Sequence, residues 1–215
     1  MKKLLLSALA LITITTNAQK VQIGFTSGIA IANLKSKVDG NSESGNAKAG
    51  FAAGILANIP VGKNFSIQPA LNYVQKGSKD EETYGSITEK MKLVINCIEL
   101  PLNFLFNSGG STTNFFIGAG PSLSIAVSGK VKYDDGTNKL SEKINFGSGD
   151  DDLMKAVDLG ANFITGVSLD NGILVSVNYN AGLNNLFPNG SADGRLRSNY
   201  FGIKLGYVLN NARKK

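Results

Sequence analysis

The sequence predicts an all-β protein, namely an eight-stranded antiparallel up-and-down transmembrane β-barrel with short periplasmic turns and long extracellular loops. Apolar residues alternate with small or polar residues along much of the chain, which is typical of strands with two different faces. The segments between these stretches are alternately short and long. After residue 18 there is no apolar stretch of 18 residues or more, which excludes a helical membrane protein.

Five segments show the period of two most clearly. In residues 173–183, one row consists of Ile173, Val175, Val177, Tyr179, Ala181 and Leu183, and the opposite row contains Ser176, Asn178 and Asn180. The same pattern is present in residues 65–73, 115–128, 158–169 and 200–209. Looser segments at about 20–33, 48–60 and 91–106 complete a set of eight predicted strands.

The connecting segments fall into two classes. The short ones are residues 61–63, 107–113 and 170–172, and the last reads Asp-Asn-Gly, a tight-hairpin signal. The long ones are residues 34–47, 76–90, 129–155 and 184–196, and they hold most of the charged residues. Short turns at one end and long loops at the other are the signature of outer-membrane barrels.

The composition of the polar row decides which face meets lipid. A soluble lipocalin-like barrel is the alternative, and its solvated row would be rich in charged residues. Here the row is mostly Gly, Ser, Asn, Gln and Ala, and its charges are Glu99, Asp158 and Lys204. Small neutral side chains suit the narrow lumen of eight strands, so the apolar row is predicted to face lipid.

The N-terminus predicts export. Lys2 and Lys3 precede a short apolar run, Leu4 to Ile14, and Ala18 ends a segment of small residues. This is the layout of a secretory signal peptide. We therefore expect residues 1–18 to be cleaved and residues 19–215 to form one outer-membrane β-barrel domain.

Several of these segments resemble a known family. Residues 65–77, FSIQPALNYVQKG, look like the third strand of the PorT-like outer-membrane β-barrel proteins of Bacteroidetes, and residues 98–102, IELPL, look like their fourth strand. Residues 24–34 are similar to the first strand. Ala70 stands where the family usually has an acidic residue, and the last strand does not end the chain on an aromatic residue. The resemblance implies a location in the outer membrane more than an activity.

The residue inventory argues against catalysis. The chain has no histidine and one cysteine, Cys97, so the usual general base and the usual zinc ligands are missing. Asp134, Asp135 and the run 150–152 lie in one long segment, but their spacing does not match an EF-hand, and a solvated acidic run is the preferred interpretation over a calcium site. We expect no catalytic residue, cofactor or metal site.

Glu99 and Lys204 are the candidate site residues. Both are predicted to point inward from the middle of their strands, and we expect them to form a lumen ion pair that neutralises buried charge; a gate or ion path is the alternative. The predicted function is a non-enzymatic integral outer-membrane protein, structural or binding through its extracellular loops; the alternative is an accessory component of a transport or secretion system. Expected partners are outer-membrane lipid and an extracellular ligand or envelope protein. No basic stripe with interleaved aromatic residues points to nucleic acid, and we expect a monomer.

Overall fold

The computed structural model describes residues 21–38, 40–84, 87–149, 151–188 and 194–209. The predicted signal peptide lies outside the described residues and stays a prediction. In the described ranges, no helix combines the length and the apolar character that a membrane span requires.

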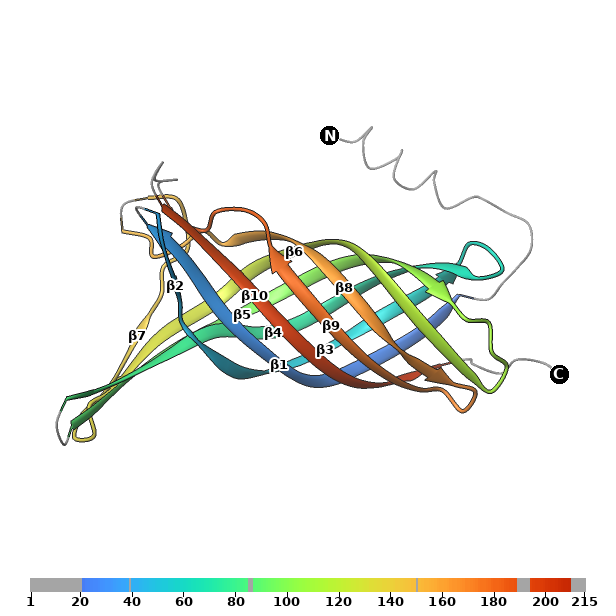
Figure 1. Cartoon of the computed structure of the whole chain (residues 1–215), viewed down its shortest axis with the longest axis horizontal. Helices are drawn as coiled ribbons and strands as arrows, with labels where there is room; N and C mark the ends of the chain where they lie inside the picture. The colour runs from blue at the N-terminus through green and yellow to red at the C-terminus, as the bar shows by residue number, and fades with distance from the viewer. Residues whose placement is uncertain (1–20, 39, 85–86, 150, 189–193, 210–215) are drawn as a thin grey trace.

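The described part of the chain forms ten strands, which Figure 1 labels. They are β1 (Gln22–Val38), β2 (Asn41–Ser44), β3 (Asn46–Pro60), β4 (Phe65–Tyr84), β5 (Ile87–Asn107), β6 (Thr113–Asp134), β7 (Lys139–Lys143), β8 (Val157–Leu169), β9 (Ile173–Gly182) and β10 (Gly194–Val208).

Eight of these strands form a closed antiparallel ring. Along the ring β1, β3, β4, β5, β6, β8, β9 and β10 are paired in sequence order, and β10 pairs with β1 from Gly24–Val208 to Val38–Gly194. Closure leaves no unpaired sheet edge, which is what a strand protein needs in lipid. The predicted eight-stranded up-and-down barrel is therefore confirmed.

The two ends of the ring differ as predicted. The connections β3–β4, β5–β6 and β8–β9 are short, and they lie at the end where β1 begins and β10 ends (Figure 1). In an outer-membrane barrel this end faces the periplasm, and the opposite end faces the outside.

The predicted long loops contain more strand than expected. Segment 76–90 was predicted as a connector, but β4 continues to Tyr84 and β5 begins at Ile87. Segment 129–155 was likewise predicted as a connector, but it includes the end of β6 and the short strand β7. Beyond the membrane both faces of a strand meet water, so the alternation of lipid and lumen residues disappears while the backbone pairing continues.

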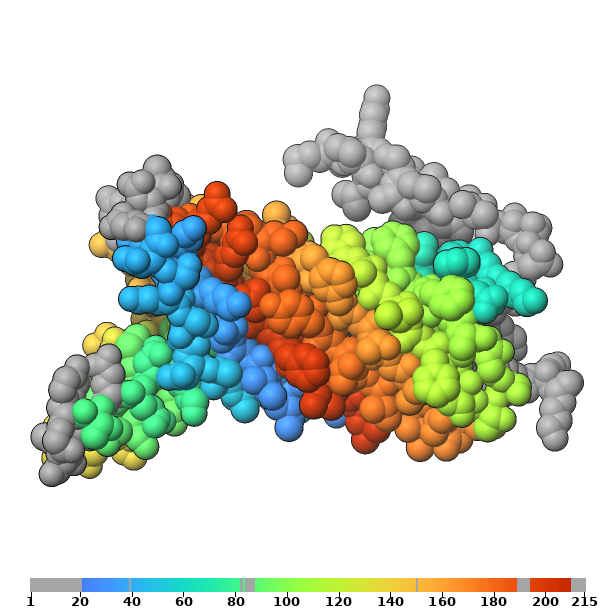
Figure 2. Space-filling view, in the orientation of Figure 1, coloured from blue at the N-terminus to red at the C-terminus, as the bar shows by residue number. Residues whose placement is uncertain are grey.

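The extended parts of β4, β5, β6 and β7 form a projection that we call the blade, residues 78–84, 87–93 and 131–143. The blade leaves the barrel at one side of the extracellular end (Figure 2). Cross-strand pairs of opposite charge, such as Lys90 with Asp134 and Asp134 with Lys139, follow one row of it. Such pairs favour sheet formation without a buried face.

Burial confirms which row of the barrel faces out. Phe104 is 55% exposed and Ile117 is 62% exposed, whereas their strand neighbours Asn103 and Phe116 are 2% and 5% exposed. The apolar row thus covers the outside of the ring, and the polar row fills the lumen together with a few apolar side chains.

Candidate functional site: a buried ion cluster in the lumen

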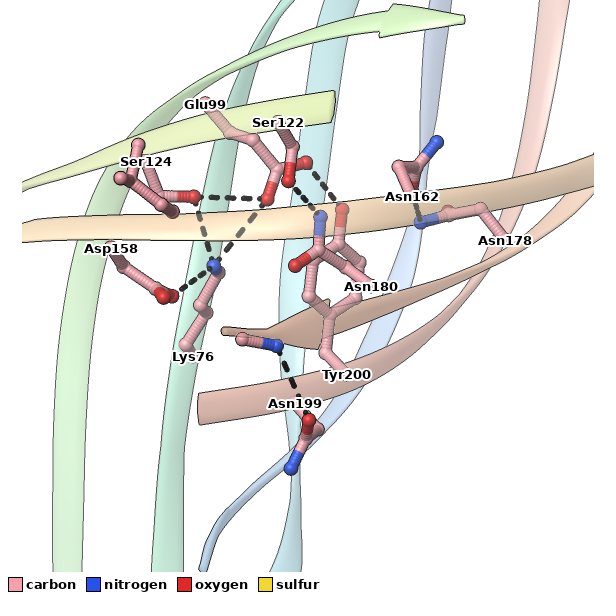
Figure 3. Close-up of polar contacts among 12 residues, drawn as sticks. Lys76, Glu99, Ser122, Ser124, Asp158, Asn162, Asn178, Asn180, Asn199 and Tyr200 are labelled. Atoms are coloured by element: carbon pink, nitrogen blue, oxygen red, sulfur yellow. Dashed lines mark hydrogen bonds and ion pairs between the residues drawn. The ribbon is translucent and has the colours of Figure 1, made fainter. Parts of the chain in front are cut away.

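Five side chains from five strands meet inside the barrel (Figure 3). They are Lys76 of β4, Glu99 of β5, Ser124 of β6, Asp158 of β8 and Tyr200 of β10, and we call them the ion cluster. Each belongs to the inward row of its strand, and none is more than 8% exposed. Ring closure places them at a similar depth, although β4 and β10 lie far apart in the sequence.

The ammonium group of Lys76 is the centre of the cluster. Its Nζ lies 3.2 Å from Asp158 Oδ2 and 3.4 Å from Glu99 Oε2, and it donates a hydrogen bond of 2.9 Å to Ser124 Oγ. The same Nζ is 5.2 Å from the ring centre of Tyr200, within the range of a cation–π contact. One cation is therefore shared between two carboxylates, a hydroxyl and an aromatic ring.

Both oxygens of the Glu99 carboxylate are occupied. Tyr200 donates a hydrogen bond of 2.5 Å to Oε1, and Ser124 donates one of 3.1 Å to Oε2. Hydrogen bonds to an ionised acceptor are short and strong. The donors hold the carboxylate in place, so that Glu99, which is 0% exposed, stays solvated by protein groups.

The cluster offsets most of the cost of burying charge in a lumen, although Asp158 Oδ1 is buried without a hydrogen-bond partner. An unpaired buried ion costs several kcal/mol, and even a buried pair is stable only when hydrogen bonds satisfy its remaining atoms. Lys76 and Lys204 balance Glu99 and Asp158, so these four buried groups carry no net charge. The arrangement links β4, β5, β6, β8 and β10 across the barrel.

The predicted ion pair needs a correction. Glu99 and Lys204 both point into the lumen as predicted, with exposures of 0% and 8%, and both line one small cavity. The ion pair that Glu99 forms, however, is with Lys76, and no ion pair within 4.0 Å joins Glu99 to Lys204, both of which the structure describes. Lys76 reaches Glu99 from the adjacent strand, where Asn72 is directly paired with Glu99, whereas Lys204 approaches from farther around the ring.

Lys76 was not predicted as a lumen residue, because residues 76–90 were predicted to form a long loop. In the structure β4 passes through Lys76 without a break in its inward row, which runs through Gln68, Asn72 and Val74. Lys76 is separated from Gln68, Asn72 and Val74 by an even number of residues, and this spacing could have placed it on the inward row. Asp158 was recognised as an inward charge, but its partner was not.

On the periplasmic side of the cluster, amide side chains fill the lumen. Asn162 donates to Asn103 at 2.8 Å, Asn178 donates to Asn162 at 3.0 Å, and Asn180 donates to Ser122 at 2.6 Å. Among these side chains a cavity of about 30 Å³ remains, lined by residues including Glu99, Tyr200 and Lys204. That space suits a single water rather than a passage.

Two other predicted features have clear positions. Cys97 is 4% exposed and packs in an apolar cluster with Leu93, Ile95 and Val131. In the acidic segment, Asp152 accepts a hydrogen bond from the Gly149 backbone, and Asp150 lies outside the described residues. The described residues contain no group of three or more candidate ligands for a metal ion.

A model of the outer membrane protein beta-barrel domain matches residues 17–188. The chain belongs to this family. Membership and the closed ring assign the protein to the outer membrane as an integral β-barrel. None of the curated proteins compared with the chain matches it.

Solved outer-membrane barrels are similar to this chain at low identity. Ail of Yersinia pestis is 12% identical with a TM-score of 0.39, covering 88% of this chain and 100% of that one. Neisserial surface protein A is 16% identical with a TM-score of 0.40, covering 86% and 96%. OprG of Pseudomonas aeruginosa is 10% identical with a TM-score of 0.33, covering 87% and 95%.

Proposed function

We propose that this protein is a non-enzymatic, plugged outer-membrane barrel that binds a protein partner outside the cell through its blade. The observation that carries the proposal is the contrast between the filled lumen and the exposed blade. The lumen is filled by the ion cluster and the amide side chains, while the blade extends paired strands with exposed apolar side chains.

The absence of an enzymatic role is supported by how the buried ionisable groups are used. Lys76 forms ion pairs with both Glu99 and Asp158, and Tyr200 donates a hydrogen bond to Glu99. A catalytic acid or base needs access to a substrate, and here the lumen beside Glu99 leaves a cavity of only about 30 Å³. The chain also has no histidine.

The blade offers a surface for recognition. Met91 pairs with Tyr133 and Tyr133 with Leu140 in one cross-strand row, and these side chains are 39%, 43% and 62% exposed. Next to this row lies a groove of about 390 Å³ lined by residues including Asp80 and Asp134. Contiguous apolar side chains rimmed by charges on a water-facing sheet are typical of protein-binding surfaces.

Site-specific photocrosslinking in intact cells tests this role. A photoreactive phenylalanine analogue at Tyr133 should give a discrete protein adduct, and its yield should fall when Met91 and Leu140 are both replaced by Ser. The same analogue at Phe104, on the lipid-facing row, should give no such adduct. Equal labelling at both positions, or no protein adduct at Tyr133, would refute a blade-bound partner.

A role as an accessory component of a transport or secretion system is compatible with the same surface, because an accessory barrel also needs a docking face. The identity of the adduct separates the two roles. A translocation component crosslinked at Tyr133 would assign the accessory role, and another envelope or extracellular protein would assign simple binding.

A further inference from the structure

The outward rows of several strands change from apolar to polar residues at one level of the barrel. On β5 the row is apolar from Phe106 to Ile98 and becomes polar at Asn96; on β4 it is apolar from Phe65 and becomes polar at Gln75. Both bands are about 10 residues long, which at a rise of about 3.3 Å and a tilt of about 40° spans about 25 Å, the height of a lipid-facing band. Asn33 ends the corresponding row of β1.

The polar residues at this level form a linked girdle. Tyr73 Oη donates to Asn96 Oδ1 at 2.9 Å, Gln75 Nε2 donates to the same oxygen at 3.2 Å, and Asn96 Nδ2 donates to Ser128 Oγ at 2.9 Å. Tyrosine and amide side chains at this position mark a membrane–water interface. The girdle therefore locates the outer boundary of the hydrocarbon.

Directly beyond the girdle the same outward rows become basic. On β4, β5 and β6, Lys79 pairs with Lys92, and Lys92 pairs with Lys132, so three lysines lie side by side in one row. On the seam between β1 and β10, Lys35 pairs with Arg197 and Lys37 pairs with Arg195. We call these seven residues the basic collar.

The collar places like charges next to each other without an internal counter-charge. In the described part of the chain, the ion pair found outside the lumen joins Lys139 and Asp134, and neither residue belongs to the collar. Lys92 and Lys132 also lie close enough to Lys48 for their charges to repel it. Like charges directly opposite on a sheet are destabilising, so an anion bound across these rows would stabilise the fold.

We propose that the basic collar binds the phosphate groups of a phosphorylated glycolipid in the outer leaflet, of the lipid A class. Lys92 lies four residues beyond Asn96 on the outward row of β5, which is about 10 Å above the hydrocarbon at the same rise and tilt. That is the depth of lipid headgroups. The charges are carried on the face that continues the lipid-facing row, so a membrane phosphate reaches them directly.

This inference rests on the position of the barrel in the outer membrane. Lys92 and Lys132 lie at the base of the blade, but they alternate with Met91 and Tyr133 along β5 and β6 and therefore lie on the opposite face from the proposed partner site. Loss of the Tyr133 crosslink would therefore leave it standing, and loss of lipid binding would leave the crosslink standing.

The test measures binding of purified, detergent-solubilised protein to bis-phosphorylated lipid A and to chemically dephosphorylated lipid A. The informative variant is Lys92→Gln with Lys132→Gln. The matched control removes the same charge elsewhere: Lys63→Gln in a periplasmic turn with Lys139→Gln, whose lysine is already paired with Asp134. We expect wild type to bind the phosphorylated lipid at least tenfold more tightly than the dephosphorylated one.

The Lys92 and Lys132 variant should lose most of that preference, while the control stays within twofold of wild type. Without lipid, the variant should unfold no more easily than wild type, because it relieves a like-charge contact. Equal affinity for both lipids, or an unchanged preference in the variant, would overturn the proposal. Competition by millimolar inorganic phosphate with no lipid preference would also overturn it, in favour of a free-phosphate site.

Discussion

Lys76 and Glu99 form a buried ion pair of 3.4 Å between adjacent strands, and each is bound by further groups from two other strands. The pair lies in a lumen with room for little more than one water. Its net effect on the free energy of unfolding therefore depends on how well protein groups satisfy the two buried charges. The consequences for stability can be measured.

Lys76→Met should lower the free energy of unfolding by about 3–5 kcal/mol, because it leaves Glu99 and Asp158 buried without their cation. Combining it with Glu99→Gln should recover part of the loss. A double-mutant cycle on urea unfolding in lipid vesicles measures the coupling.

The corresponding cycle for Glu99→Gln and Lys204→Met tests the pair that the sequence analysis predicted. We expect a smaller coupling there, because Lys204 forms no ion pair with Glu99 within 4.0 Å and both residues are described. A coupling as large as that of Lys76 with Glu99 would show that Lys204 shares the carboxylate equally.

Tyr200→Phe should destabilise the barrel by about 1.5–3 kcal/mol, since it removes a hydrogen bond to an ionised, buried carboxylate. Tyr207→Phe is the control, because Tyr207 lies on the outward row and is 41% exposed. The midpoint of the heat-induced mobility shift on gels reports both variants. Equal effects would mean that the Tyr200 hydroxyl contributes nothing specific.

The purified barrel should give no steady porin-sized conductance in planar bilayers, because side chains fill an eight-stranded lumen. The removal of Tyr200, Lys76 and Glu99 side chains by a triple Ala substitution should increase small-ion leakage. Large stable channels from the wild-type protein would contradict the plugged lumen.

Gly77→Ala should be strongly destabilising. Gly77 has φ = +136° within β4, and an added Cβ would collide with the backbone carbonyl oxygen of Leu93. Gly136→Ala is the matched control, since Gly136 also has positive φ, +85°, but has open space around it. In the control, the free energy of unfolding should fall by about 1–2 kcal/mol from backbone strain alone. An equal loss in both variants would show that the strands move apart enough to accommodate the added Cβ at residue 77.

The turn at the end of the β6–β7 hairpin should weaken in acid. The Gly136 N–H and Lys139 hold the pKa of Asp134 below its usual range, and backbone N–H groups of Asn138 and Thr137 do the same for Asp135. A lowered pKa means that the stabilisation is present at neutral pH and is lost as pH falls through the folded-state pKa. Side-chain carboxyl NMR titration checks this, and Asp135→Asn should abolish the pH dependence of the Asn138 amide shift.

The alternation of residues was enough to predict the class, the strand number and the inward row. Residues 173–183 show why. Their apolar row alternates with Ser176, Asn178 and Asn180, so only one orientation places apolar side chains toward lipid and amide side chains in the lumen. Glu99 and Lys204 were correctly placed inside on the same argument. The periplasmic turns followed from their short length and turn residues.

Which inward charges meet was decided by the tertiary structure. Contact between two inward charges depends on the register of strands that are distant in sequence. Alternation predicts which face of the sheet a residue is on, but it does not predict the depth of that residue in the barrel relative to residues on other strands. Lys76 was assigned to a loop because the outward row of β4 becomes polar at Gln75, which ends the apolar–polar alternation although the inward row continues. The blade and the rows of the basic collar arise from cross-strand pairing. Local sequence determined their residues, pairing among β4, β5, β6 and β7 determined the neighbours in the blade, and closure of the barrel determined the neighbours on the β1–β10 seam.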